Sequence, residues 1–179
     1  MEQILATISQ LFTVSGSRRQ NELLYFAECP KEHLVGLLTH LRDHEGFTHL
    51  TFVTAVDRIE DGRFQVVYML HNYDSGMQLG IEVYIGRDAP ELDSIHTLWE
   101  QARVFQQELR EMFGIRFPGS PRLDENFALE GWDGIPPMRR DFDTKKYSEE
   151  TFFPRPGRFS EEPREYMKKK LYPDRGSDV

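Results

Sequence analysis

Apolar residues in the first part of the chain recur at helical and then strand-like spacings. Residues 1–12 and 30–41 place isoleucine, leucine or phenylalanine three or four positions apart, which predicts two amphipathic helices. Residues 21–29 (NELLYFAEC) predict a short strand between them. Pro30 suits the first turn of the second helix, and Gly46 is the expected residue at its end.

Three strand-like segments follow. Residues 48–56 are rich in β-branched and aromatic side chains. Large apolar residues then recur at every second position, at Phe64, Val66, Tyr68 and Leu70 and at Met77, Leu79, Ile81, Val83 and Ile85. Turn-forming residues at 57–62 and 74–76 separate the three segments. The pattern predicts an antiparallel meander with one face packed on helices.

A helical stripe comes next. Its apolar positions are spaced 3, 4, 3, 4 and 3 residues apart: Ile95, Leu98, Ala102, Phe105, Leu109 and Met112. The stripe predicts one helix of five turns. Ser94 is the expected N-cap, Gly114 the expected residue after the end, and Ile115 is available for a closing hydrophobic contact.

The pattern is lost after Phe117. Eight of the ten prolines lie at or beyond Pro118, and prolines at this density block helix interiors and central strands. Aromatic residues nevertheless persist there, whereas a freely disordered linker is poor in them. We therefore predict an α+β fold: a globular domain over 1–117, with a mostly antiparallel sheet packed against helices, followed by a long extended C-terminal tail over 118–179 that docks on partner subunits. One short helix is predicted within the tail, at about 163–171.

The charge is unevenly placed along the chain. The net charge is -8, and residues 1–115 hold 9 Lys/Arg against 17 Asp/Glu, whereas residues 116–179 hold 13 of each. The first part should repel nucleic acid and anionic membrane surfaces, so no nucleic-acid partner is expected. No apolar run approaches the roughly 20 residues that span a bilayer. The single cysteine, Cys29, excludes an internal disulfide and any cysteine-ligated cluster held by this chain alone.

Two pairs of side chains could form a metal site or a catalytic site. His40 and His44 are four residues apart and could share a helix face, but no third metal ligand is fixed by spacing, so we interpret them as exposed histidines. Glu108 and Glu111 are three apart and could act as an acid/base pair. A polar stripe facing solvent or a partner is the preferred interpretation of these two glutamates.

The stretch from residue 105 to 142 carries a series of short motifs in a distinctive order. The motifs, with two others further upstream, are TAVD (54–57), FQVVY (64–68), QELREMFGI (107–115), FPGSPRL (117–123) and WDGIPPMRRDF (132–142). In order and spacing they closely resemble the 30-kDa subunit of NADH-quinone oxidoreductase, respiratory complex I.

The chain departs from that family pattern at several positions. Gln107 stands in place of the usual first glutamate, Glu111 in place of an aspartate, and Ser120 in place of a histidine. Residues 124–127 (DENF) replace Arg-Arg-Ile-Leu, and Arg140 replaces a lysine. A divergent branch is expected, and related subunits of membrane-bound hydrogenases and formate hydrogenlyase-type complexes stay open as alternatives.

The resemblance implies a structural subunit with no active site and no cofactor of its own. It implies a place in the peripheral arm at the cytoplasmic face of the cell membrane, with membrane contact only through the complex. The implied partners are a 49-kDa-type (hydrogenase large-subunit-like) subunit and a small subunit that carries iron–sulfur clusters. Two alternatives from other classes are a small stand-alone enzyme using Glu108 and Glu111 as acid and base, and an independent adaptor.

Seven residues are the candidate partner contacts that the resemblance and the composition suggest: Glu108, Glu111, Trp132, Arg139, Arg140, Asp141 and Phe142. The charged members would form ion pairs or hydrogen bonds between subunits, and the aromatic members would be buried anchors. The alternative is that these residues pin the tail to the chain's own domain, and the sequence leaves both interpretations open.

Overall fold

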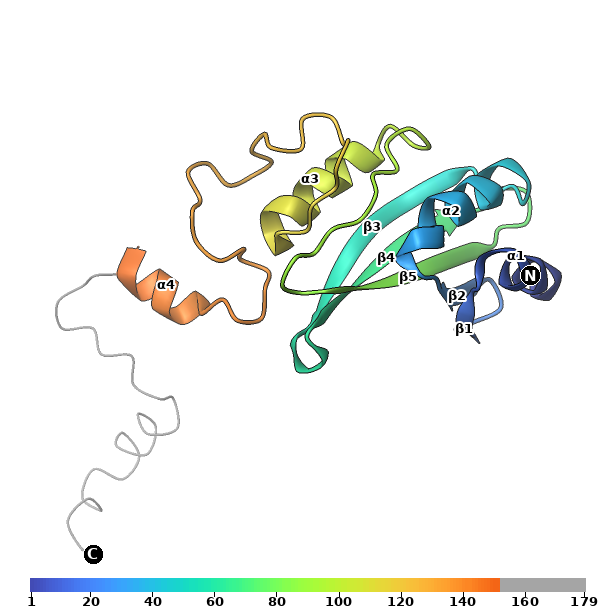
Figure 1. Cartoon of the computed structure of the whole chain (residues 1–179), viewed down its shortest axis with the longest axis horizontal. Helices are drawn as coiled ribbons and strands as arrows, with labels where there is room; N and C mark the ends of the chain where they lie inside the picture. Colours follow the sequence, from blue (N-terminus) through green and yellow to red (C-terminus); the bar gives the residue numbers. More distant parts are fainter. Residues whose placement is uncertain (152–179) are drawn as a thin grey trace, which may run out of the picture. The chain divides into compact units, whose positions relative to one another are not determined.

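The computed structural model describes residues 1–151 (Figure 1). The chain divides into two compact units, Met1–Phe142 and Asp143–Val179. The elements of the first unit are α1 (Glu2–Phe12), β1 (Ser15–Arg19), β2 (Leu24–Glu28), η1 (Lys31–His33), α2 (Leu34–Asp43), β3 (His49–Arg58), η2 (Ile59–Asp61), β4 (Arg63–His71), β5 (Gln78–Gly86) and α3 (Ala102–Phe113). The described part of the second unit contains α4 (Thr144–Thr151), whose first turn is capped by the Asp143 carboxylate.

Five strands form one sheet in the order β1-β2-β5-β4-β3. Strands β3, β4 and β5 form the predicted antiparallel meander, and β2 pairs with β5 in parallel. The strand predicted at 21–29 is confirmed as β2. The edge strand β1 was not predicted, because its sequence SGSRR is exposed throughout and has no apolar alternation.

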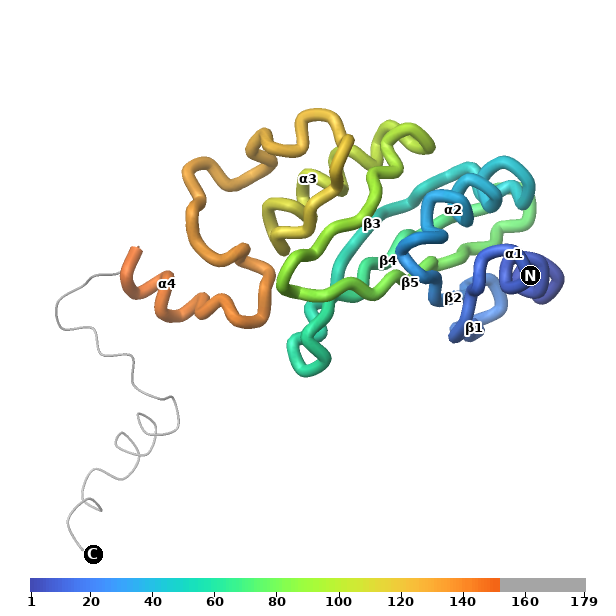
Figure 2. Tube along the Cα trace, in the orientation of Figure 1, coloured from blue at the N-terminus to red at the C-terminus, as the bar shows by residue number. Residues whose placement is uncertain are grey.

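Alternation along the strands decides which side chains enter the core. On β4, Phe64, Val66, Tyr68 and Leu70 are fully buried, and they belong to one core with the buried leucines of α2 and α3. Both helices lie along this side of the sheet (Figures 1 and 2). The predicted α+β fold, with a mostly antiparallel sheet packed against helices, is therefore confirmed.

The helix predicted to start at Ser94 starts later, at Ala102, so that prediction was wrong at its first two turns. The Trp99 indole N–H donates to the carbonyl of Thr48 at 2.8 Å, and the Gln101 side-chain amide donates to the carbonyl of Leu50. These bonds tie the preceding segment to the start of β3 as a series of turns. The helical spacing of its apolar residues reflects burial in turns, not a continuous helix.

The end of this helix is as predicted. Gly114 has a φ of 77°, a left-handed conformation that favours glycine, and Ile115 is fully buried. A Cβ atom at position 114 would lie 3.1 Å from Arg139 Nη2 and 3.3 Å from Pro136 Cγ. Glycine is thus required both by the backbone turn and by the close approach of a later segment.

Cys29 is 4% exposed at the end of β2, and burial raises the pKa of its thiol to about 11. At pH 8, roughly one molecule in a thousand should then carry the reactive thiolate. We expect iodoacetamide to modify the native chain far more slowly than the urea-unfolded chain, as followed by intact mass. Equal rates in the two states would show that Cys29 is exposed.

Two predicted features lie outside the described residues: the helix at about 163–171 and the part of the tail beyond Thr151. Residues 118–142, where the tail was predicted to begin, belong to the same compact unit as the sheet.

Candidate functional site

The C-terminal end of α3 is the centre of the candidate site. The last turn of a helix leaves carbonyl oxygens without intrahelical donors. The N–H of Gly114 donates to the carbonyl of Arg110 at 2.9 Å, as expected for a left-handed cap. The carbonyls of Met112 and Phe113 need donors from elsewhere in the chain.

The motif PPMRRD supplies those donors. The N–H of Met138 donates to the carbonyl of Met112 at 3.0 Å, and Nε of Arg139 donates to the carbonyl of Phe113 at 2.7 Å. The Arg139 guanidinium lies over the ring of Phe64, 5.2 Å from its centroid. A cation at this position also complements the negative end of the helix dipole. The later segment therefore acts as a cap for α3.

Asp57 anchors the same segment to the sheet. Its side chain is 1% exposed, and its Oδ1 lies 2.8 Å from Nε of Arg87. Its Oδ2 accepts hydrogen bonds from Nη2 of Arg87 at 3.1 Å and from the backbone N–H of Arg140 at 2.9 Å. The hydrogen bond with Asp57 is the main cause of the raised pKa of Arg87. One buried carboxylate thus holds β3, the residue after β5 and the later segment together.

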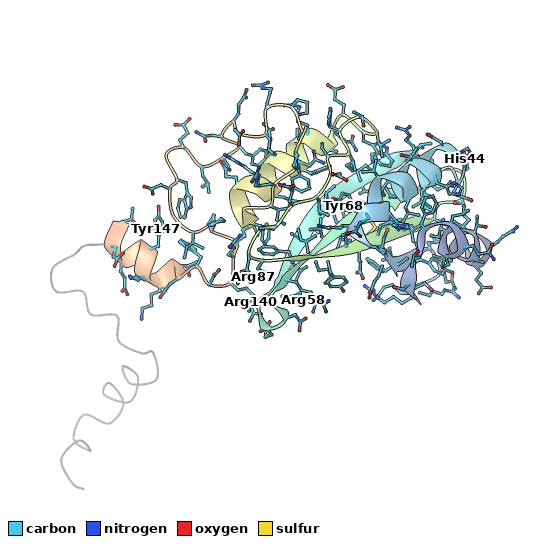
Figure 3. All side chains as sticks on the ribbon, in the orientation of Figure 1. His44, Arg58, Tyr68, Arg87, Arg140 and Tyr147 are labelled. Atoms are coloured by element: carbon cyan, nitrogen blue, oxygen red, sulfur yellow. The ribbon has the colours of Figure 1, made fainter. Side chains whose placement is uncertain are left out.

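Two further ion pairs with exposed carboxylates lie beside this buried anchor, and Figure 3 labels their arginines, Arg87 and Arg140. Nη1 of Arg140 lies 2.6 Å from both carboxylate oxygens of Glu60, and Asp141 accepts from Arg87 at 2.9 Å. The hydrogen bond from Arg140 lowers the pKa of Glu60. Because the Arg140–Glu60 pair is exposed to solvent, it contributes far less stability than the Asp57 contacts.

Glu111 fixes the backbone of the segment after α3 at residues 127–129. Near the end of α3, its carboxylate accepts three backbone hydrogen bonds: from Phe127 at 3.0 Å, Ala128 at 2.7 Å and Leu129 at 3.1 Å. Both carboxylate oxygens are engaged. The arrangement is an anchor for an irregular loop, in which charge-assisted bonds replace secondary structure.

Three predicted site residues remain: Trp132 and Phe142, which contact each other, and Glu108, which does not join the contacts of Glu111. The ring of Trp132 meets that of Phe142 edge to face at 5.4 Å, and its indole N–H donates to the carbonyl of Ile135 at 3.1 Å. Glu108 is half-buried on α3, and its carboxylate forms no ion pair with residues 1–151. Trp132 and Phe142 therefore contact each other, while Glu108 is not joined to Glu111 in a shared site.

A hollow of about 620 Å³ lies beside the family-divergent stretch, lined by residues of α3 and of 116–125. Arg110 pairs with Asp124 at 3.2 Å, and Arg122 pairs with Glu125 at 2.5 Å. Asp124 and Glu125 stand where the resembled family has arginines, so here they neutralise two arginines of the chain itself.

His40 and His44 lie with ring centroids 5.1 Å apart, and His40 Nε2 lies 3.3 Å from Glu45. Within residues 1–151, no group of three or more His, Cys, Asp or Glu side chains could hold a metal ion. No helix in this part of the chain is long and apolar enough to cross a membrane.

The sequence did not identify Asp57, Glu60 and Arg87 as residues that bind the segment after α3. A signal for Asp57 exists: it continues the buried alternation of Val53 and Ala55 along β3, where a carboxylate needs a partner. The sequence does not reveal which arginine that partner is.

The motifs that meet here, TAVD, MFG and PPMRRD, are among those on which the family resemblance rests. Residues 27–148 match the family model described as the 30-kDa subunit of respiratory-chain NADH dehydrogenase. The chain belongs to this family. The C subunit of NADH-quinone oxidoreductase from Moorella thermoacetica is 34% identical over 113 residues, 63% of this chain and 76% of that protein. A C subunit of the same enzyme from Rhizobium etli is 32% identical over 152 residues, 83% and 76% of the two chains.

A solved structure shows the same fold in a larger assembly. A chain of the membrane-bound sulfane sulfur reductase, described as an archaeal respiratory membrane complex, superposes with a TM-score of 0.80. The match covers 90% of this chain and 96% of that chain at 21% sequence identity. Family membership makes this 30-kDa-type chain a subunit of a complex I-like assembly.

Proposed function

We propose that this chain is a non-catalytic structural subunit of the peripheral hydrophilic arm of a complex I-like, ion-translocating oxidoreductase. It holds a 49-kDa-type subunit and a cluster-bearing small subunit together at the cytoplasmic face of the membrane. In this role it keeps the distances for electron transfer short, and the iron–sulfur clusters belong to the partner subunits. The assembly so proposed is of the NADH- or ferredoxin-quinone oxidoreductase type.

One observation carries the proposal: the segment after α3 is fixed in place, yet it displays apolar side chains to solvent. Phe127, Ile135 and Met138 are 43%, 49% and 55% exposed. Glu111 binds the backbone N–H groups of residues 127–129, and Arg139, next to Met138, donates to the carbonyl of Phe113 at the end of α3. A rigid loop with exposed apolar residues among charged ones is typical of a protein interface.

Four of the seven candidate contact residues acquire a more specific proposed role. Glu111, Arg139, Arg140 and Asp141 position the segment within the chain, and the exposed side chains beside them contact the partner. The stand-alone acid/base alternative would need Glu111 free to exchange protons with a substrate. Its three backbone hydrogen bonds favour the anchoring role instead.

The test replaces Ile135 and Met138 by aspartate in the full chain, expressed in its native host. We expect most of the chain to be lost from the purified assembly, because two charges would be buried in an apolar contact, at a cost of several kcal/mol. The thermal midpoint of the isolated variant should stay near that of the wild type, since both side chains are exposed.

Leu23→Asp is the matched control, because Leu23 is a 50% exposed apolar residue in a turn far along the chain from this segment. Unchanged incorporation of the Ile135/Met138 variant would contradict the proposed interface. The large subunit recovered with the wild-type chain distinguishes a quinone-reducing complex from the equivalent subunit of a membrane-bound hydrogenase or formate hydrogenlyase-type complex.

A further inference from the structure

The sheet has a second face that takes no part in the helix-covered core. Its side chains come from alternate positions of four strands: Phe26, Phe52, Val56, Val67, Met69 and Tyr84. None of them belongs to the core shared with the helices. We call this surface the open face. Phe52 and Val56 are 39% and 44% exposed on it, so within Met1–Phe142 it is an apolar surface with no helix over it.

Two arginines stand on the open face in fixed positions. The Arg63 guanidinium lies over the ring of Tyr84, 4.4 Å from its centroid. Nε and Nη2 of Arg58 both donate to Oε1 of Gln65, at 3.0 and 2.6 Å. These contacts hold both guanidinium groups without using a carboxylate, apart from an exposed approach of 3.7 Å between Arg63 and Asp61.

A third arginine on this face is already neutralised. Arg18 pairs with both oxygens of Glu82 at 2.7 and 2.5 Å and lies over the ring of Phe26. The hydrogen bond with Glu82 raises the pKa of Arg18. Its charge is therefore balanced within the chain, and Glu28 lies near it on the same face, within electrostatic reach of Arg18 and Tyr84. Arg58 and Arg63 place their positive charge at the β3–β4 end of the face. This contrasts with the acidic excess of residues 1–115 as a whole.

We propose that the open face is a docking surface for a partner protein that presents an apolar stripe flanked by carboxylates. This rests on the proposed function, because the partner is a neighbour in the same assembly. Phe52 and Val56 meet the stripe, and Arg58 and Arg63 pair with the carboxylates. Arginine and aromatic side chains held in advance lose little freedom on binding, which is typical of residues that dominate interfaces.

The charge pattern disfavours two other occupants. A second copy joined by a two-fold axis would bring the same arginines toward one another, which costs free energy. An anionic membrane would meet Arg58 and Arg63 but be repelled by the acidic excess of the surrounding domain. An acidic and apolar protein surface satisfies both the arginines and the apolar centre.

The experiment places a photo-crosslinking amino acid at position 56 of the full chain and irradiates the purified native assembly. We expect a crosslink to another subunit, at a segment with apolar residues and with Asp or Glu nearby. Arg58→Glu with Arg63→Glu should reduce retention of the chain in the assembly about tenfold or more. Arg19→Glu is the matched control, since Arg19 is an exposed strand arginine over Tyr25, at the other face of the sheet edge.

Thermal midpoints of the three purified variants exclude misfolding as the cause. Crosslinks from position 56 to residues 143–179, to a second copy or to lipid would overturn the inference, as would unchanged retention of the double variant. In each of those outcomes the chain is still found in the assembly, so the proposed function stands. Absence of the wild-type chain from any complex I-like assembly would overturn both.

Discussion

Replacing Asp57 by alanine is expected to lower the free energy of unfolding by roughly 3 kcal/mol, and the thermal midpoint by roughly 6–12 °C. The Asp57 carboxylate is buried and is the main partner of Arg87, whose side chain is only 15% exposed. Its removal leaves a partly buried guanidinium without that partner and takes away the acceptor of the Arg140 N–H. Thermal and urea unfolding of the purified chain, followed by circular dichroism, measure the loss.

Glu60→Ala is the control for this effect. Glu60 binds the side chain of the same residue, Arg140, but it lies in solvent, so its loss should lower the free energy of unfolding far less than the loss of Asp57. The comparison separates a buried anchor from an exposed ion pair at one location. Equal and small losses in the two variants would contradict the anchoring role of Asp57.

The sheet could be predicted where the local pattern decides the structure. Strands β3, β4 and β5 have clear alternation and turn residues between them, so both their positions and their antiparallel pairing follow from neighbouring residues. The parallel pairing of β2 with β5 joins residues about fifty positions apart, for example Phe26 with Gly80. No local pattern encodes such a pairing.

The segment before α3 shows that apolar residues can have helical spacing without forming a helix. Ile95 and Leu98 continue the apolar stripe of the helix, and Ile95 is fully buried. Turns can bury residues at the same spacing, because side chains of Trp99 and Gln101 bind backbone carbonyls near the start of β3. These tertiary hydrogen bonds determine that the segment before Ala102 forms turns and not a helix. They cannot be read from the local sequence.

The candidate site was located by sequence but not explained by it. The motif order pointed to residues 105–142, and the family comparison confirms that resemblance. What the sequence could not provide is the reason that MFG and PPMRRD occur together. Met138 and Arg139 satisfy the last carbonyls of α3, and Gly114 leaves the room that Arg139 needs. The two motifs form one helix cap whose halves are separated in the chain.

This cap also explains how a proline-rich segment stays ordered without secondary structure. Residues of such a segment lack regular backbone partners, and burying them unpaired is costly. Here the acceptors come from the folded domain: the carboxylates of Glu111 and Asp57 and the carbonyls at the end of α3. The domain thereby fixes a loop that can present apolar residues, such as Ile135, to another subunit.

Glu111→Ala is expected to release the middle of this loop while leaving the sheet folded. Three backbone N–H groups, at residues 127–129, lose a charged acceptor whose hydrogen bonds contribute about 1.5–3 kcal/mol each. Because the loop can turn these groups to water, the cost should appear as local opening. Amide exchange at residues 127–129 should become roughly 10–100-fold faster, as measured by hydrogen–deuterium exchange with mass spectrometry.

Glu108→Ala provides the matched control, because it removes a glutamate of the same helix that binds no backbone group of the loop among residues 1–151. Exchange in β4 should be unchanged in both variants, since its buried residues belong to a core cluster that includes neither glutamate and none of residues 127–129. If the loop guides assembly, Glu111→Ala should also reduce recovery of the chain with its complex. Unchanged exchange at residues 127–129 in Glu111→Ala would show that other contacts hold the loop, and that the resemblance in this motif reflects something other than anchoring.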